Sequence, residues 1–94
     1  MKARVEYDNY IDSLHITTGK NTVLGTVVIG NFICDVSSDG AIVGIEIDNA
    51  SETLALAPGV LAQVQSAQLE VLTRNQMIMI KFVLLMEGKQ IVCY

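Results

Sequence analysis

Acidic side chains are the residues of this chain whose types and spacing come closest to a chemical site. Two polar segments interrupt apolar runs, and each carries a pair of aspartates: Asp8 and Asp12 in the first, Asp35 and Asp39 in the second. Hard cations such as Ca²⁺ take roughly six to eight oxygen ligands. Two such segments that meet at one end of a sheet would therefore form a metal or small-ligand site.

The same aspartates also suit turns that need no ligand. Asp39 is followed by Gly40, a frequent hairpin signal, and Asp8 and Asp12 can accept local backbone N–H groups at a corner. The sequence favours this structural interpretation and leaves the cation site as an alternative. No cofactor is predicted.

His15 and Glu46 are the other candidates for chemistry. A histidine base needs a positioned nucleophile or a substrate pocket, and the sequence indicates neither. Glu46 lies in an apolar strand and should need a partner, for which Lys81 and Arg4 are the candidates. Phosphate-binding glycine loops, Ser or Cys nucleophile motifs and zinc-ligand spacings are absent. We therefore expect a protein that is not an enzyme.

Length, charge and hydropathy narrow the class of protein further. Ninety-four residues predict one domain over residues 1–94. The net charge is −4 without a basic stripe, so nucleic-acid binding is not expected. The first residues lack the apolar stretch of a signal peptide, and the longest apolar run, 77–86, is too short for a membrane helix. These features predict a cytoplasmic protein that does not bind membranes.

The two cysteines, Cys34 and Cys93, lie in apolar runs without the Cys-x-x-Cys spacing of metal or redox sites. Reduced, buried thiols are the favoured interpretation. A disulfide stays open as the alternative.

Hydrophobic periodicity predicts an α+β fold: a mostly antiparallel sheet of about seven strands with one or two short helices after residue 47. Asn49 and Glu52 resemble a capping box that starts a helix over about 50–56, and Pro58 suits the first position of a second helix to about Val64. In the central hairpin, alternation places Ala41, Val43, Ile45 and Ile47 on one face with Phe32, Cys34 and Val36. The predicted strands are 3–8, 13–18, 23–29, 32–36, 41–47, 68–73, 77–86 and, at the end of the chain, 90–94.

The strand over 77–86 is apolar on both faces, and this predicts self-association. One face of it should join the core. The other face needs either the short helices or a second subunit to cover it, and a homodimer is favoured. The predicted interface residues are Met77, Met79, Lys81, Val83 and Leu85.

Two segments of the chain together resemble a known family. The first reads Tyr7-Asp8, three residues, Asp12-Ser13-Leu14-His15-Ile16; the second reads Asp35, three residues, Asp39-Gly40, then Val43-Gly44-Ile45-Glu46-Ile47 and Ala50-Ser51. This pattern resembles a small prokaryotic family known only as a domain of unknown function. The resemblance implies a β-rich fold with a helix after the Gly-Ile-Glu-Ile strand and implies no catalytic residues.

The resemblance also implies a possible kind of partner, because some members of the family are encoded beside small toxin-like proteins. An acidic chain would then act as the antitoxin-like partner of a small basic protein. The principal expectation from the residues themselves is a protein-interaction module that self-associates, with the antitoxin-like role and ligand binding through the aspartates as alternatives.

Overall fold

A computed structural model describes residues 2–19, 23–38, 41–74 and 77–93, and among them are eight strands and two short helices. The fold class predicted from the sequence is confirmed. The strands are β1 Lys2–Asp8, β2 Ser13–Thr17, β3 Val23–Ile29, β4 Phe32–Ser37, β5 Ile42–Ile47, β6 Ser66–Arg74, β7 Met77–Met86 and β8 Lys89–Cys93; the helices are α1 Ala50–Thr53 and α2 Pro58–Leu61.

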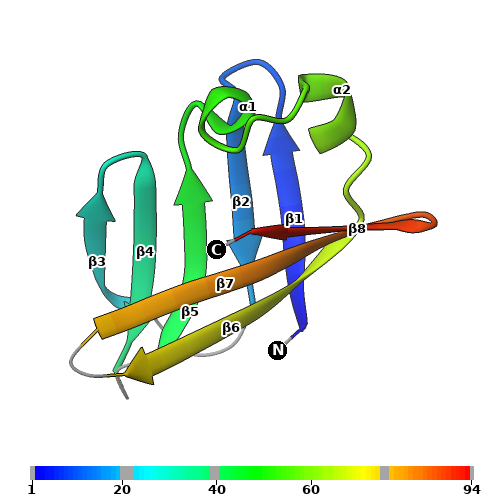
Figure 1. Ribbon diagram of the computed structural model, residues 1–94. Helices are drawn as coiled ribbons and strands as arrows, with labels where there is room; N and C mark the ends of the chain where they lie inside the picture. The colour runs from blue at the N-terminus through cyan, green and yellow to red at the C-terminus, as the bar shows by residue number, and fades with distance from the viewer. Residues whose placement is uncertain (1, 20–22, 39–40, 75–76, 94) are drawn as a thin grey trace.

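The strands form one antiparallel sheet in the order β3-β4-β5-β2-β1-β6-β7-β8, which folds over itself at β1. Strand β1 pairs with β2 from Arg4 to Asp8, and it pairs with β6 only at Lys2–Gln68 and Ala3–Ala67. In Figure 1, β6, β7 and β8 cross the first five strands at a steep angle and form a second layer. The two helices lie at one end of these layers, beside the β1–β2 turn (Figure 1).

The apolar core fills the space between the two layers. Strand alternation sends Leu14 and Ile16 inward from β2, and Phe82 and Leu84 inward from β7. The buried side chains are aliphatic apart from Phe82 and Cys34, which suits a chain with few aromatic residues. The buried members of the cluster are Ala3, Leu14, Ile16, Cys34, Ile45, Ile47, Ala50, Leu61, Ala67, Leu69, Phe82 and Leu84.

A shift of register in the central hairpin changes which residues of β5 reach this core. Beyond the Asp35–Gly44 pair the ladder slips, so that Val36 pairs with Ile42 and Val43 is the extra residue of a bulge. Ile42 consequently packs against the core cluster, and Val43 is buried outside it. The predicted alternation, which placed Val43 on the same face as Ile45 and Val36, is therefore wrong at this end of the hairpin.

The helices are shorter than the sequence predicts, and α1 is capped differently. Asn49 has φ 49° and ψ 48°, a left-handed conformation in which its side chain makes no cap hydrogen bond. The expected Asn49–Glu52 capping box is thus absent, because its first residue has the wrong backbone geometry. Pro58 does occupy the first turn of α2, where its missing N–H costs nothing.

Helix α1 ends in a Schellman motif that has alanine where glycine is preferred. The N–H of Leu56 donates to the carbonyl of Ser51 at 3.0 Å, and the N–H of Ala55 donates to that of Glu52 at 3.3 Å. This geometry places Ala55 at φ 55°, where a Cβ atom is strained. Ala55 is exposed, so its methyl group adds little packing that would offset the strain.

The strain at Ala55 predicts that Ala55→Gly stabilises the protein. Glycine enters the left-handed region without a Cβ clash, and although it raises the entropy of the unfolded chain, the net gain should be about 0.5–1 kcal/mol. Urea denaturation followed by circular dichroism measures the change.

Ala62→Gly is the matched control, because Ala62 is also exposed but has φ −67° and ψ −18°, in the right-handed region that alanine adopts without strain. Glycine should there lower stability, because it raises the entropy of the unfolded chain and relieves no strain. Equal effects of the two substitutions would show that the conformation of Ala55 stores no strain.

Candidate functional site

Asp12 is the best-connected of the predicted site residues, and its contacts are structural. One carboxylate oxygen accepts the Tyr7 hydroxyl at 2.6 Å, and the other accepts the Ser51 hydroxyl at 2.7 Å. The N–H of Ser51 also donates to this carboxylate, at 3.1 Å and 3.3 Å to its two oxygens. The N–H of Ala50 donates to the Asp12 carbonyl at 2.9 Å. The β1–β2 turn thus supplies the cap of α1 that Asn49 does not.

Charge and hydrogen bonding in this cluster shift two pKa values in opposite directions. The hydrogen bond from Tyr7, followed by that from Ser51, holds the pKa of Asp12 below its ordinary value of 3.8. The same hydrogen bond to Asp12 is the main reason that the pKa of Tyr7 rises from 10.0 to about 12. At neutral pH the cluster therefore holds a carboxylate and a neutral phenol, so Tyr7 remains a donor.

The other predicted acids do not join Asp12. Asp8 accepts the backbone N–H of Tyr10 at 2.9 Å, as expected for a turn aspartate. Asp35 lies on β4, where it accepts the Thr26 hydroxyl at 3.2 Å. The register places Asp35 in the cross-strand row of Arg4, so Asp8 is roughly 13 Å further along the strand direction.

The alternative prediction, a metal site formed by these acids, finds no assembled set of ligands among the described residues. Asp39, the fourth acid of the predicted set, lies outside them. Within the ranges that the structure describes, no three His, Cys, Asp or Glu residues are grouped so that they could hold a metal ion.

His15 and Glu46 face each other on the outer side of the first layer. The β2–β5 register places them directly opposite, and His15 Nε2 lies 3.5 Å from Glu46 Oε1. The partner of Glu46 is therefore His15, and the prediction of Lys81 or Arg4 is wrong. The reason is the strand order, since β2 lies next to β5 whereas β7 lies in the other layer.

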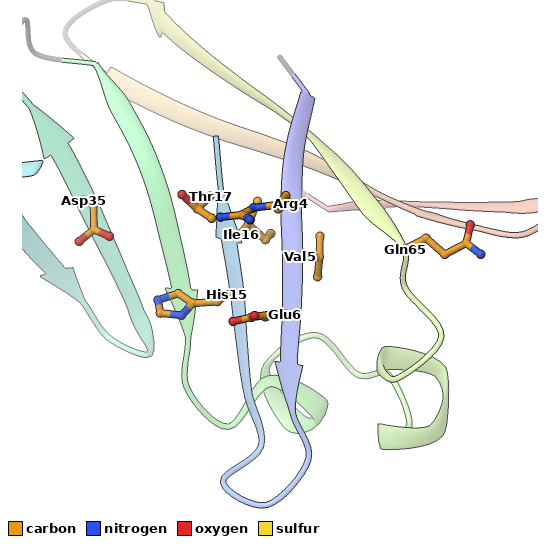
Figure 2. A pocket seen from close by; sticks show the side chains of 8 residues that line it. All are labelled: Arg4, Val5, Glu6, His15, Ile16, Thr17, Asp35 and Gln65. Atoms are coloured by element: carbon orange, nitrogen blue, oxygen red, sulfur yellow. The ribbon is translucent and has the colours of Figure 1, made fainter. Parts of the chain in front are cut away.

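A shallow polar groove of about 400 Å³ follows the same outer face. Figure 2 shows Arg4 reaching over β2 beside Thr17, with His15 directed from β2 over β5 on the side of Asp35. In the register Gly44 lies between Thr17 and Asp35, and a Cβ atom there would lie 3.0 Å from the Asp35 carboxylate. The groove thus offers donors and acceptors of both charges, but a base–nucleophile pair is not among its described polar contacts.

The predicted interface on β7 is only partly accessible. Met79 is exposed, whereas Lys81, Val83 and Leu85 are half-buried, and the Met77 side chain lies outside the described residues. Their cross-strand neighbours on this outer face include the polar Gln68, Glu70 and Gln90. Figure 1 places the helices at one end of the layers, so they do not cover this face.

The most exposed apolar element is β3, which contributes none of the predicted interface residues. All seven residues of Val23–Ile29 are exposed, and five of them are large and apolar. Tyr10 and Ile11 are also exposed, at the tip of the β1–β2 turn. The signal in the sequence was a strand-length run without any charge, Val-Leu-Gly-Thr-Val-Val-Ile, which a terminal strand normally avoids.

Cys34 is a free, buried thiol, as predicted, and burial raises its pKa. The side chain of Cys93 lies outside the described residues. Among the helices of the described ranges, none has both the length and the apolar content to cross a membrane.

The Asp12 cluster predicts that Asp12→Asn destabilises the protein in a pH-dependent way. Asparagine tolerates the φ of 54° at this position but removes the charge that accepts from Tyr7 and Ser51. Because the folded pKa of Asp12 is lowered, its contribution is complete above 3.8 and is lost as the pH falls through the folded pKa. The wild type should therefore exceed the variant in urea midpoint at pH 7, and the difference should shrink below pH 3.8.

Asp8→Asn is the control for this experiment, because it makes the same charge change in the same turn but removes an acid with one exposed hydrogen bond. Its midpoint should move less than that of Asp12→Asn. Tyr7→Phe should raise the pKa of Asp12 toward its ordinary value, which a carbon-detected NMR titration reports. An unchanged titration would contradict the assigned hydrogen bond.

Comparison with known proteins identifies a family and no characterised relative. No curated protein and no solved structure shows significant similarity to the chain. Residues 4–51, from β1 to the first turn of α1, match the family described as "Protein of unknown function (DUF2283)". This confirms the resemblance drawn from the two sequence segments. The match spans just over half of the 94 residues, and the chain therefore belongs to this family.

Proposed function

We propose that this protein is a non-enzymatic protein-interaction module that self-associates. The observation that carries the proposal is the amount of apolar surface that the described residues expose to solvent. Ten large apolar side chains are exposed among the described residues, and half of them belong to one strand, β3. Exposed apolar surface in one contiguous stretch marks an interaction site more often than surface scattered singly.

The contacts of the acidic residues support a role without chemistry at those residues. Asp12 caps α1, Asp8 orders its own turn, Asp35 accepts from Thr26, and Glu46 faces His15. Each described candidate thus has a structural partner, whereas a catalytic acid or base must keep its reactive atoms available to a substrate.

Self-association predicts a molar mass that rises with protein concentration. Sedimentation velocity from about 5 µM to about 500 µM covers the range expected for an interface of modest size. Because apolar contact drives association and each copy carries −4, added salt should screen the repulsion and strengthen association. A chain that stays monomeric at the highest concentration would contradict the proposal.

A further inference from the structure

We propose that two copies of this chain associate by pairing β3 of one copy antiparallel to β3 of the other across a two-fold axis. This inference rests on the proposed self-association and identifies the surface that carries it. The contact would join two sheets through their terminal strands.

The position of β3 leaves one of its edges open. It is the first strand in the sheet order and pairs with β4 alone among the described strands. Every second residue of β3 therefore directs its N–H and C=O groups away from the sheet, where another strand can pair with them. The bulge between Val23 and Gly25 lies at one end, so Gly25–Ile29 is a regular segment that can form a ladder.

The two terminal strands of this sheet differ in the features that normally block edge pairing. Strand β8 has five residues and begins with Lys89, whereas β3 has seven residues and no charge. The one proline of the chain, Pro58, lies in α2. Charged residues, proline, short length and bulges are devices that protect an edge, and of these β3 has only the bulge at its Val23 end.

Strand β7, the interface predicted from the sequence, is less suited to the contact. It pairs with β6 along nearly its whole length and with β8 from Phe82 to Met86, so among the described strands its open edge is limited to Met77–Lys81 and includes a charged residue. Its outer face also shares a surface with Gln68, Glu70 and Gln90. Association there would have to desolvate those polar side chains.

The apolar area of β3 suits a second copy. Its five large apolar side chains are about half to three-quarters exposed, and with the backbone and the other two residues the strand presents roughly 500 Å². Edge pairing covers the backbone edge and the flanks of the side chains while both faces of the strand stay exposed, so two copies would together bury less than about 1,000 Å², the size of a weak interface. We therefore expect a dimer of micromolar rather than nanomolar affinity.

Charge also favours like-with-like pairing at this strand. Each copy carries a net charge of −4, so two copies repel each other wherever acidic surfaces meet. An uncharged strand is the part of the surface where that repulsion is least. A two-fold axis makes the contact self-complementary and closes it at two subunits.

Lysine substitutions on β3 test this inference. Val28 and Ile29 are 65% and 62% exposed and lie in the regular segment, so Val28→Lys and Ile29→Lys should fold normally while bringing like charges together across the two-fold axis. Each should raise the dimer dissociation constant at least about tenfold. Val92→Lys is the matched control, because Val92 is 45% exposed on β8, the other terminal strand, and the charge change is the same. Thermal unfolding verifies that each variant is folded.

Hydrogen exchange gives a second readout that does not depend on a substitution. Amide protons of β3 should exchange more slowly as the wild-type concentration rises through the dissociation constant, whereas those of β8 should not change. Slowing confined to β3 supports strand pairing, and unchanged β3 exchange in a dimer overturns it.

The outcomes separate this inference from the proposed function. If the wild type dimerises and the β3 variants dimerise equally well, the inference fails and the proposed function stands. A dimer broken by Met79→Asp but not by the β3 variants would assign the contact to β7. If Val92→Lys also abolishes association, β3 pairs with β8 in an open chain of subunits, and the two-fold dimer is wrong. A wild type that remains monomeric overturns both proposals.

Discussion

The apolar contact between the two layers depends on β1, because β1 pairs with β2 in one layer and with β6 in the other. The pairing with β6 is confined to two positions, and Ala3 and Ala67 face each other at one of them. Both alanines are buried, and their small side chains let the backbones of the crossing strands lie close under the core. A large side chain at either position would push the layers apart and open the core around Leu14, Ile16 and Leu84.

The Asp12 cluster gives a physical meaning to the pattern by which the chain resembles its family. Tyr7 and Asp12 stand near the beginning of the matched segment, and Ser51 is its last residue. Hydrogen bonds through the Asp12 carboxylate therefore bring the two ends of the segment together, and with them the β1–β2 turn and α1. In this chain the pattern therefore covers the first layer and the hydrogen bonds that join its β1–β2 turn to α1. The second layer begins only at β6, after the matched segment. The place of Tyr7, Asp12 and Ser51 in the pattern thus follows from the hydrogen bonds that they make in the fold.

Local patterns in the sequence predicted the strands well, because alternation at period two is a property of each strand alone. Phe82 and Leu84 lie on the face of β7 opposite the predicted interface, Leu14 and Ile16 alternate with polar residues in β2, and all four are buried. The errors share a different cause: each depends on residues distant in the chain. Asn49 looked like a helix cap, but the cap comes from Asp12, 39 residues from Ser51.

The same limit applies to the outer face. The partner of Glu46 follows from strand order, which periodicity does not contain, and a one-residue bulge moved Ile42 to the core in place of Val43. Strand order also decides which strand is terminal. The run 23–29 was predicted as a strand, but nothing local in it shows that it would lie at an edge.

Because β3 is a terminal strand, the core of one subunit does not account for its apolar composition. The inward positions of this strand, Val27 and Ile29, pair with Cys34 and Phe32 but are themselves exposed, so they add little to the buried core. A strand with alternating polar residues would form the same ladder with β4 and would be safer against aggregation. The proposed contact with a second strand would account for this composition, because it pairs the free N–H and C=O groups of the open edge and brings apolar side chains of the two copies together across the strands.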